Sequence, residues 1–351
     1  MIHRVEKLEM LLAMWMSEFY KFHDLKVGRF TIFAIMKKET FIEQNVSKIE
    51  MPPIIEAALL ILTMLFCMLL SEGIKEIIGI GFTAISEMPS EMASVNQRNL
   101  LRTSALLSNS FSFILPALIF SYFMYRKNWL SKLKLNTAFV PEWIVPMLVF
   151  VFAGFFFSQF TYWLNQMLPL PEWANTMEEQ TGDLIQTILI MESPLEFLFT
   201  LTIVAVIPAI GEELIFRGIL QRRLEEIMKN PHFAILISAL IFSFIHFQFA
   251  GFFPQVVLGL LLGYLYFWTR NLWVPILAHF VINGFQVCAA YLAKDKIGDI
   301  DATELANLPA NQMLITAVVS LFFIYLAGNW FYQRQNSLSN STNSNENYTN
   351  I

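Results

Sequence analysis

The stretch FTLTIVAVIPAIGEELIFRG, residues 199–218, joins an apolar run to a compact group of charges. Residues 199–210 carry no charged side chain, which is typical of a helix inside a bilayer. Glu212, Glu213 and Arg217 follow directly. A charged side chain at the centre of a membrane costs about 2.5–3.5 kcal/mol on insertion scales, so charges beside such a run are expected to have a specific role.

The composition of the whole chain also predicts a membrane protein. Of the 351 residues, 56% are hydrophobic and 15% are charged, whereas soluble proteins carry about 25% charged residues. This composition excludes a disordered chain and argues against a soluble globule. The net charge of −5 argues against nucleic acid as a partner. Cys67 and Cys288 lie inside apolar runs, which argues against a disulfide framework or a cysteine-based metal site.

Eight segments are apolar enough to be membrane helices, since a bilayer core of about 30 Å takes about 20 helical residues. The sequence therefore predicts an all-α fold, a polytopic membrane helix bundle with about eight transmembrane helices. The predicted spans are about 53–71, 105–125, 143–166, 195–210, 233–248, 255–269, 272–292 and 313–332.

The charges of the loops orient this bundle. Loop 126–142 holds four Lys or Arg residues against one acid, and 217–229 is basic again. Loop 167–195 holds five acids and no Lys or Arg. Because Lys and Arg favour the cytoplasmic side, both termini are predicted to lie in the cytoplasm.

The two ends of the chain differ from the bundle, which we expect at 53–333. Residues 1–52 mix charges with Met and aromatic residues, which predicts a partly amphipathic N-terminal extension with a candidate interfacial helix at 5–20. No signal-peptide pattern is found there. Residues 334–351 are rich in Asn, Ser and Thr, which predicts a disordered polar tail.

The first polar cluster is the group that follows residue 210. Pro208 cannot donate a backbone hydrogen bond, so we expect it to break or start a helix and to place both glutamates in a first turn. Glu213 and Arg217 are four residues apart and share a face, while Glu212 points about 100° away from Glu213. Taken alone, the cluster is equally typical of an ion pair that caps a helix.

Two further spans carry polar groups. His246 follows Phe242 by four residues, and His279 precedes Asn283 by four. Singly, these are typical of a structural histidine and of an interhelical hydrogen-bond pair. Together with Glu212 they form a complementary set. A carboxylate and an imidazole can deprotonate a water, and a second imidazole and a carboxamide can donate to an oxyanion.

Three motifs in this order resemble the CAAX protease and bacteriocin-processing (CPBP) family. They are Glu-Glu-x-x-x-Arg at 212–217, Phe-x-x-x-His at 242–246 and His-x-x-x-Asn at 279–283. That family includes the eukaryotic type II CAAX prenyl endopeptidase and bacterial Abi proteins, and the surrounding residues are similar to its bacterial branch. The resemblance implies an intramembrane endopeptidase of the glutamate type, with its protease core at 195–292, in a bacterial plasma membrane.

The resemblance also implies roles for individual residues. The implied catalytic residues are Glu212 as general base, His246 as its partner on the water, and His279 and Asn283 as the oxyanion hole. The implied supporting residues are Glu213 and Arg217, which would orient Glu212, and Phe242, which would shape the pocket. A full-length fifth span would place His246 near its outer end, while Glu212 and His279 lie nearer the cytoplasm.

The resemblance favours a mechanism without a cofactor, and no HExxH helix pair is present. A zinc-dependent version, with Glu212, His246 and His279 as ligands, is the alternative mechanism. The alternative functions are a non-proteolytic membrane binding or immunity protein of the same fold, and a small transporter with a carboxylate proton relay. The expected partners are membrane lipids and a peptide or membrane-protein substrate.

Overall fold

The computed structural model of the protein describes residues 51–81, 94–293 and 309–349, with side chains as far as residue 337. The regular structure of these residues is helical throughout, with no strand among them, which confirms the all-α prediction. Residues from Pro53 onward form one compact unit. The predicted extension at 1–52 lies almost entirely outside the described residues, and its candidate interfacial helix at 5–20 lies wholly outside them.

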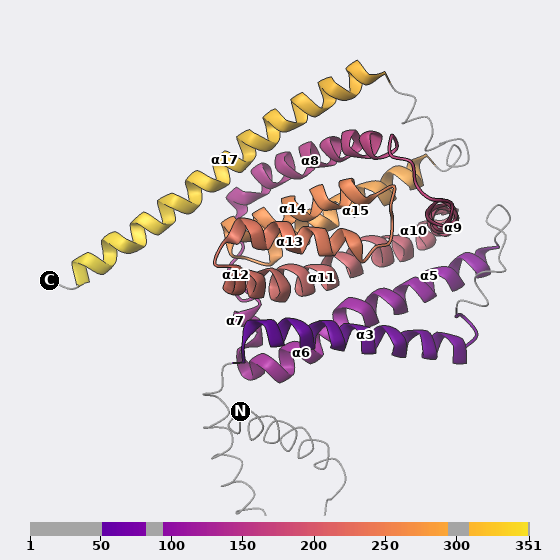
Figure 1. The fold of residues 1–351 in the computed structure, drawn as a ribbon, viewed down its shortest axis with the longest axis horizontal. Helices are drawn as coiled ribbons and strands as arrows, with labels where there is room; N and C mark the ends of the chain where they lie inside the picture. Colours follow the sequence, from indigo (N-terminus) through magenta and orange to yellow (C-terminus); the bar gives the residue numbers. More distant parts are fainter. Residues whose placement is uncertain (1–50, 82–93, 294–308, 350–351) are drawn as a thin grey trace, which may run out of the picture. The chain divides into compact units, whose positions relative to one another are not determined.

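Each of the eight predicted spans overlaps one apolar helical segment of the bundle (Figure 1). Within the described part of the chain, seven segments are long and apolar enough to cross a membrane, and α13 (Pro231–Phe244) is shorter. The seven are α3 (Pro53–Ile77), Val95–Lys132, Pro141–Asn165, Pro194–Met228, α14 (Phe252–Thr269), α15 (Trp273–Leu292) and the Ala310–Ser337 part of α17 (Ala310–Thr349).

Several of these segments are composite helices. Val95–Lys132 consists of α5 (Val95–Asn109), η1 (Ser110–Ile114), α6 (Leu115–Tyr125), η2 (Arg126–Asn128) and α7 (Trp129–Lys132). Pro141–Asn165 consists of η3 (Pro141–Trp143) and α8 (Ile144–Asn165). Pro194–Met228 consists of α10 (Pro194–Leu201), η4 (Thr202–Val206), α11 (Ile207–Glu213), η5 (Leu214–Gln221) and α12 (Arg222–Met228). The segments η1, η4 and η5 are π-helical.

The helix does not break at Pro208, which corrects the expectation from the sequence. The π-helical turn of η4 precedes the proline, and the N–H of Ile207 donates to the carbonyl of Thr202, five residues back. Such turns let a helix continue past a residue that lacks an N–H. Glu212 and Glu213 therefore lie in the interior of a continuous helix and not in a first turn.

Two apolar cores hold the bundle together. The first joins α3, α6, η5 and α13 through buried residues that include Leu60, Phe120, Phe216 and Phe242. The second joins α8, α14, α15 and α17 through residues that include Met147, Leu262, Ala278 and Phe331. The outward faces of α3 and α17 remain apolar and exposed, as contact with lipid requires.

The helix α17 continues to Thr349, through residues 334–349, for which the sequence predicts disorder. Adding residues to an existing helix is far less costly than starting one, so the membrane-length part of α17 can propagate into the polar residues.

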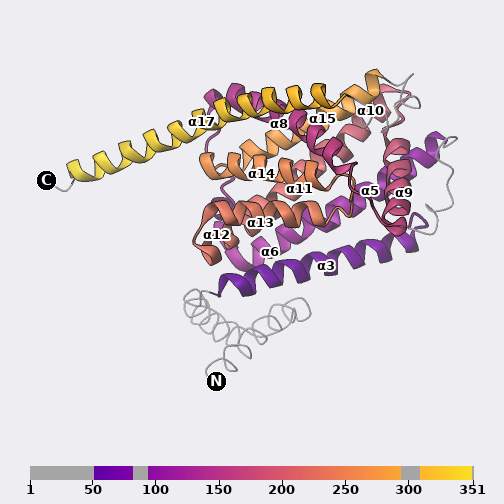
Figure 2. The same ribbon diagram turned by 45° about the horizontal axis from the view of Figure 1, so that its top comes forward.

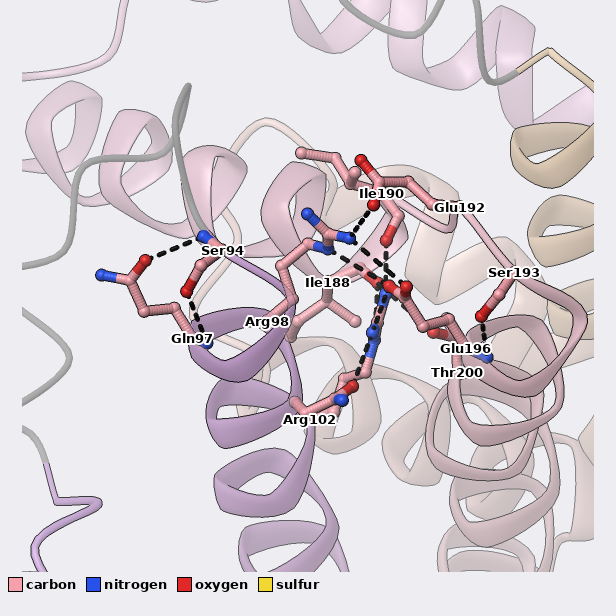
Figure 3. Close-up of polar contacts among 11 residues, drawn as sticks. Ser94, Gln97, Arg98, Arg102, Ile188, Ile190, Glu192, Ser193, Glu196 and Thr200 are labelled. Carbon is pink, nitrogen blue, oxygen red and sulfur yellow. Dashed lines mark hydrogen bonds and ion pairs between the residues drawn. The ribbon is translucent and has the colours of Figure 1, made fainter.

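The remaining helix, α9 (Glu172–Leu189), runs across the ends of the membrane-length helices (Figure 2). A group of charges, the arginine latch (the buried Arg98, Arg102 and Glu196, with the exposed Glu192), holds its connection to α10 (Figure 3). Arg102 is fully buried and donates to Glu196 at 2.9 Å and to the carbonyls of Ile188 and Ile190. The sequence analysis missed this latch, although Arg102 stands directly before an apolar span.

We expect Arg102→Met to lower the free energy of unfolding by about 3–5 kcal/mol, because it leaves the buried Glu196 with one partner fewer. Glu192→Gln is the matched control. The Glu192 side chain is 65% exposed, and loss of its ion pair with Arg98 should cost about 0–1 kcal/mol. Unfolding in detergent measures both variants, and equal losses would contradict the assignment of the latch as a buried network.

Candidate active site

The three motif helices bring their polar groups to one depth in the bundle. Glu212 lies near the middle of Pro194–Met228, about 24 Å of helix before Met228. The following helix, α13, starts at Pro231 and runs back for 14 residues, about 21 Å. Its end therefore returns to the level of Glu212. The short α13 thus explains how His246 meets Glu212, which a full-length span would prevent.

Glu212 faces both histidines. Its Oε2 atom lies 3.9 Å from Nε2 of His246 and 3.9 Å from Nε2 of His279. The residue is buried, and this oxygen has no hydrogen-bond partner among the described residues. A buried carboxylate oxygen without a partner is costly. The two gaps are too long for direct hydrogen bonds, but one water between the three atoms would bond to each.

These groups line one cavity of about 500 Å³. Its wall includes Phe242 and all four residues predicted to be catalytic. The wall also carries several side-chain amides that the site prediction left out. Their position within or beside apolar spans is the sequence signal that could have identified them. They are Asn109, Gln159, Gln248, Gln255 and Gln286.

A backbone carbonyl fixes the ring of His246. Its Nδ1 lies 2.7 Å from the carbonyl oxygen of Phe242. Because a carbonyl can only accept, Nδ1 carries a proton, and in the neutral form of such a ring Nε2 presents its lone pair toward Glu212. This orientation suits a ring that accepts a hydrogen bond from a water.

A buried carboxylate fixes the ring of His279. Glu213 Oε1 accepts from Nδ1 of His279 at 2.9 Å and from Nη1 of Arg217 at 2.8 Å. Arg217 also donates from Nη2 to the carbonyl of Gly259 at 3.0 Å. The resemblance implied that Glu213 and Arg217 orient Glu212, but these bonds lead to His279. The reason is that consecutive helical residues diverge by about 100°.

Asn283 is held by the first motif helix. Pro208 has no N–H, so the carbonyl four residues earlier, that of Val204, lacks its usual α-helical donor. Asn283 Nδ2 donates to this carbonyl at 3.0 Å. Partners from neighbouring helices commonly satisfy such carbonyls in membranes. The second N–H of the amide remains for the cavity that Asn283 lines.

Two glycines allow the helices to approach at the site. A Cβ atom on Gly211, the residue before Glu212, would lie 2.8 Å from Cβ of Phe113. A Cβ on Gly259 would lie 2.9 Å from Cα of Ala239. Both distances are too short for a larger residue, so these glycines let α11 pack on η1 and α14 pack on α13.

The donor atoms are spaced too widely for zinc as they stand. Ligands about 2.0–2.2 Å from a tetrahedral zinc lie about 3.3–3.6 Å apart, compared with 3.9 Å between Glu212 and each histidine. Among the described residues, no group of three His, Cys, Asp or Glu side chains is close enough to hold a metal ion. The spacing fits a shared water better than it fits a zinc ion.

We expect Asn283→Ala to lower the free energy of unfolding by about 1–3 kcal/mol, because the carbonyl of Val204 loses its side-chain donor. Pro208→Ala supplies an N–H four residues after that carbonyl. The Asn283→Ala change should therefore cost less in the Pro208→Ala background. Unfolding in detergent of the wild type, the two single variants and the double variant gives this double-mutant cycle. Equal costs of Asn283→Ala in both backgrounds would contradict the bond from Asn283 to the carbonyl of Val204.

Comparison with known proteins places this site in context. The family model of type II CAAX prenyl endopeptidase Rce1-like proteins matches residues 194–285. "Uncharacterized protein YpbD" of Bacillus subtilis (strain 168) is 36% identical over 84 residues, 23% of this chain and 40% of that protein. "Putative membrane peptidase YdiL" of the same organism is 29% identical over 140 residues, 40% of this chain and 55% of that protein. The chain thus spans about half the length of these relatives. No solved structure matches significantly.

The matched segment contains every residue that the three motifs contribute to the site. Together with the seven membrane-length helices, the match identifies an integral membrane protein. The resemblance to the CAAX protease and bacteriocin-processing family, and to its Rce1-like members in particular, is therefore confirmed over residues 194–285.

Proposed function

We propose that this protein is an intramembrane endopeptidase that hydrolyses a peptide bond with a water activated by Glu212 and His246. One observation carries the proposal. Glu212 Oε2 lies 3.9 Å from Nε2 of His246 and of His279, on the wall of one cavity. The match to an endopeptidase family supports the same reaction class. The proposed location is a bacterial plasma membrane, with both termini in the cytoplasm.

The first step is attack by water. A water held between the three atoms donates one hydrogen to Glu212 Oε2 and the other to Nε2 of His246. Glu212 takes its proton as general base, and the oxygen forms a bond to the carbonyl carbon of the substrate. The electron pair of the C=O bond moves to the carbonyl oxygen, which becomes an oxyanion.

The second requirement is stabilisation of that oxyanion. Asn283 donates its free N–H from one side. His279 has an N–H on Nε2 only when both of its ring nitrogens are protonated, because Nδ1 already donates to Glu213. The carboxylate of Glu213 stabilises that cation. His279 and Asn283 then act as two fixed donors, and each such donor typically contributes about 10²–10³ in rate.

The tetrahedral intermediate then breaks down. The electron pair of the oxyanion re-forms the C=O bond, the C–N bond breaks, and the leaving nitrogen takes the proton that Glu212 holds. The carboxylate of Glu212 is thereby restored for the next water. The apolar wall with its amides would take a short unwound segment of a peptide or membrane-protein substrate, since main-chain groups can bond to amide side chains.

We expect Glu212→Gln to lower cleavage by about 10²–10⁴-fold while the protein stays folded in the membrane. Glu172→Gln changes an exposed carboxylate at the start of α9 and is the matched control. Quantitative proteomics of membranes that contain either variant or the wild type measures both activity and substrate. Substrate cleavage by Glu212→Gln at the wild-type level would refute the role of Glu212. A biological phenotype that survives this change without cleavage would favour the non-proteolytic alternative.

The metal-free form of the mechanism predicts that cleavage survives exhaustive chelation. The reason is that the proposed water is held by one carboxylate and two imidazoles, without a metal ion. Cleavage assays before and after chelation, combined with metal analysis of the purified protein, test this expectation. Stoichiometric zinc whose removal stops cleavage would establish the zinc-dependent version instead.

A further inference from the structure

The loop that follows His246 has an unusual backbone. Residues 245–251 connect α13 to α14, and His246 lies in the turn at the start of this loop. The next residue, Phe247, has φ 50°, a left-handed conformation that disfavours a residue with a side chain. Such a conformation persists only where the surroundings hold it. The contacts that hold this loop therefore also determine where His246 lies.

A buried amide on α8 makes the first of these contacts. Asn165, the last residue of α8, is 4% exposed. Its Nδ2 atom donates to the carbonyls of Phe249 and Ala250 at 2.7 and 2.9 Å. Both hydrogens of the amide are therefore committed to two consecutive residues of the loop, three and four positions after His246.

Contacts from α9 complete the set. Glu178 Oε1 accepts from the backbone N–H of Ala250 at 3.1 Å. The ring of Trp173 lies edge-on to the ring of Phe249, with 5.1 Å between centroids. The same helix contributes Ile185 and Ile188 to the wall of the cavity. One helix thus contacts both the cavity and the loop of His246.

The opposite end of the loop is also fixed. Ser243 Oγ donates to the carbonyl of Phe252 at 2.8 Å, which joins the last turn of α13 to the first residue of α14. The backbone after His246 is therefore bonded on both sides, and the ring itself is bonded to Phe242. Because His246 is itself a residue of this loop, we expect a change in the loop backbone to move its ring.

We propose that Asn165 is a positioning residue for His246, and that Glu178 makes this position depend on α9. This inference rests on the proposed function only for its catalytic consequence. Asn165 acts through the loop and does not touch the cavity. When α9 lies across the bundle as it does in the structure, the loop has all its partners and His246 faces Glu212. Displacement of α9 removes the partner of the N–H of Ala250.

The histidine rings provide a readout that does not depend on cleavage. The chain has five histidines, so protein labelled with carbon-13 at the ring Cε1 atoms gives few signals in detergent micelles. His246→Gln and His279→Gln assign the two site signals. We expect Asn165→Ala to shift or broaden the His246 signal and to leave the His279 signal in place.

Asn271→Ala is the matched control. Asn271 is also fully buried, and its Nδ2 also donates to two consecutive loop carbonyls, those of Thr137 and Ala138, at 3.2 and 3.0 Å. It lies at the other end of the bundle from the loop of His246. The control variant should lose stability as Asn165→Ala does, but its His246 signal should stay at the wild-type position.

A second pair of variants tests the link to α9, and it serves even where Asn165→Ala does not fold. Glu178→Ala should shift the His246 signal in the same direction as Asn165→Ala. Its neighbour Glu179 is exposed, so Glu179→Ala should leave the signal unchanged. A His246 signal that stays in place in Glu178→Ala would overturn the dependence on α9.

Cleavage kinetics test the catalytic consequence. The substrates are peptides identified by the proteomics of wild-type and Glu212→Gln membranes. Misplacement of His246 should lower kcat by about 10–100-fold in Asn165→Ala, with little change in KM. A His246 signal that does not move in Asn165→Ala, or that moves equally in Asn271→Ala, would overturn the inference. If the wild type cleaves nothing, the proposed function fails, while the ring signals still decide the placement.

Discussion

The carboxylate of Glu213 is the interaction on which the rest of the site depends. It is fully buried and lies between two hydrogen-bond donors, Arg217 on its own helix and His279 on another. A buried charge in a bundle surrounded by lipid requires such partners, because solvent cannot replace them. The pairing fixes the distance between the fourth and seventh predicted spans, and it aims Nε2 of His279 at Glu212. The remaining site residues are placed relative to this pair.

Backbone hydrogen bonding imposes the second constraint. Pro208 leaves the carbonyl of Val204 without its α-helical donor, and the π-helical turn before it lets the helix continue. Asn283 serves that carbonyl and faces the cavity with the same amide group. One side chain thus satisfies a structural need of one motif helix and supplies a donor from another. This sharing explains why a proline occurs so close to the two glutamates.

The sequence predicts the eight apolar segments well, because hydropathy alone determines which residues can face lipid. The sequence also predicts that Glu212, His246, His279 and Asn283 act together, since their types and spacing suit one reaction. The structure places all four on the wall of one cavity. The sequence does not predict the continuous helix through Pro208, because the partner of Val204 lies 79 residues away. The bond from His279 to Glu213 and the Arg102 network were missed for the same reason. Such long-range pairs depend on packing, which periodicity along one helix does not contain.

The shortness of α13 has a consequence for the lipid around the protein. A helix of 14 residues covers only about two thirds of a bilayer core, so, if its first residue lies at one membrane surface, its last carbonyls and the loop after it would lie below the level of a normal headgroup layer on the other side. Polar backbone at that depth must be screened from acyl chains. Bilayers commonly accommodate a short membrane element by thinning beside it, which would bring the aqueous phase closer. A hydrolase surrounded by hydrocarbon also needs a supply of its second reactant, and this dip in the membrane would deliver it next to His246.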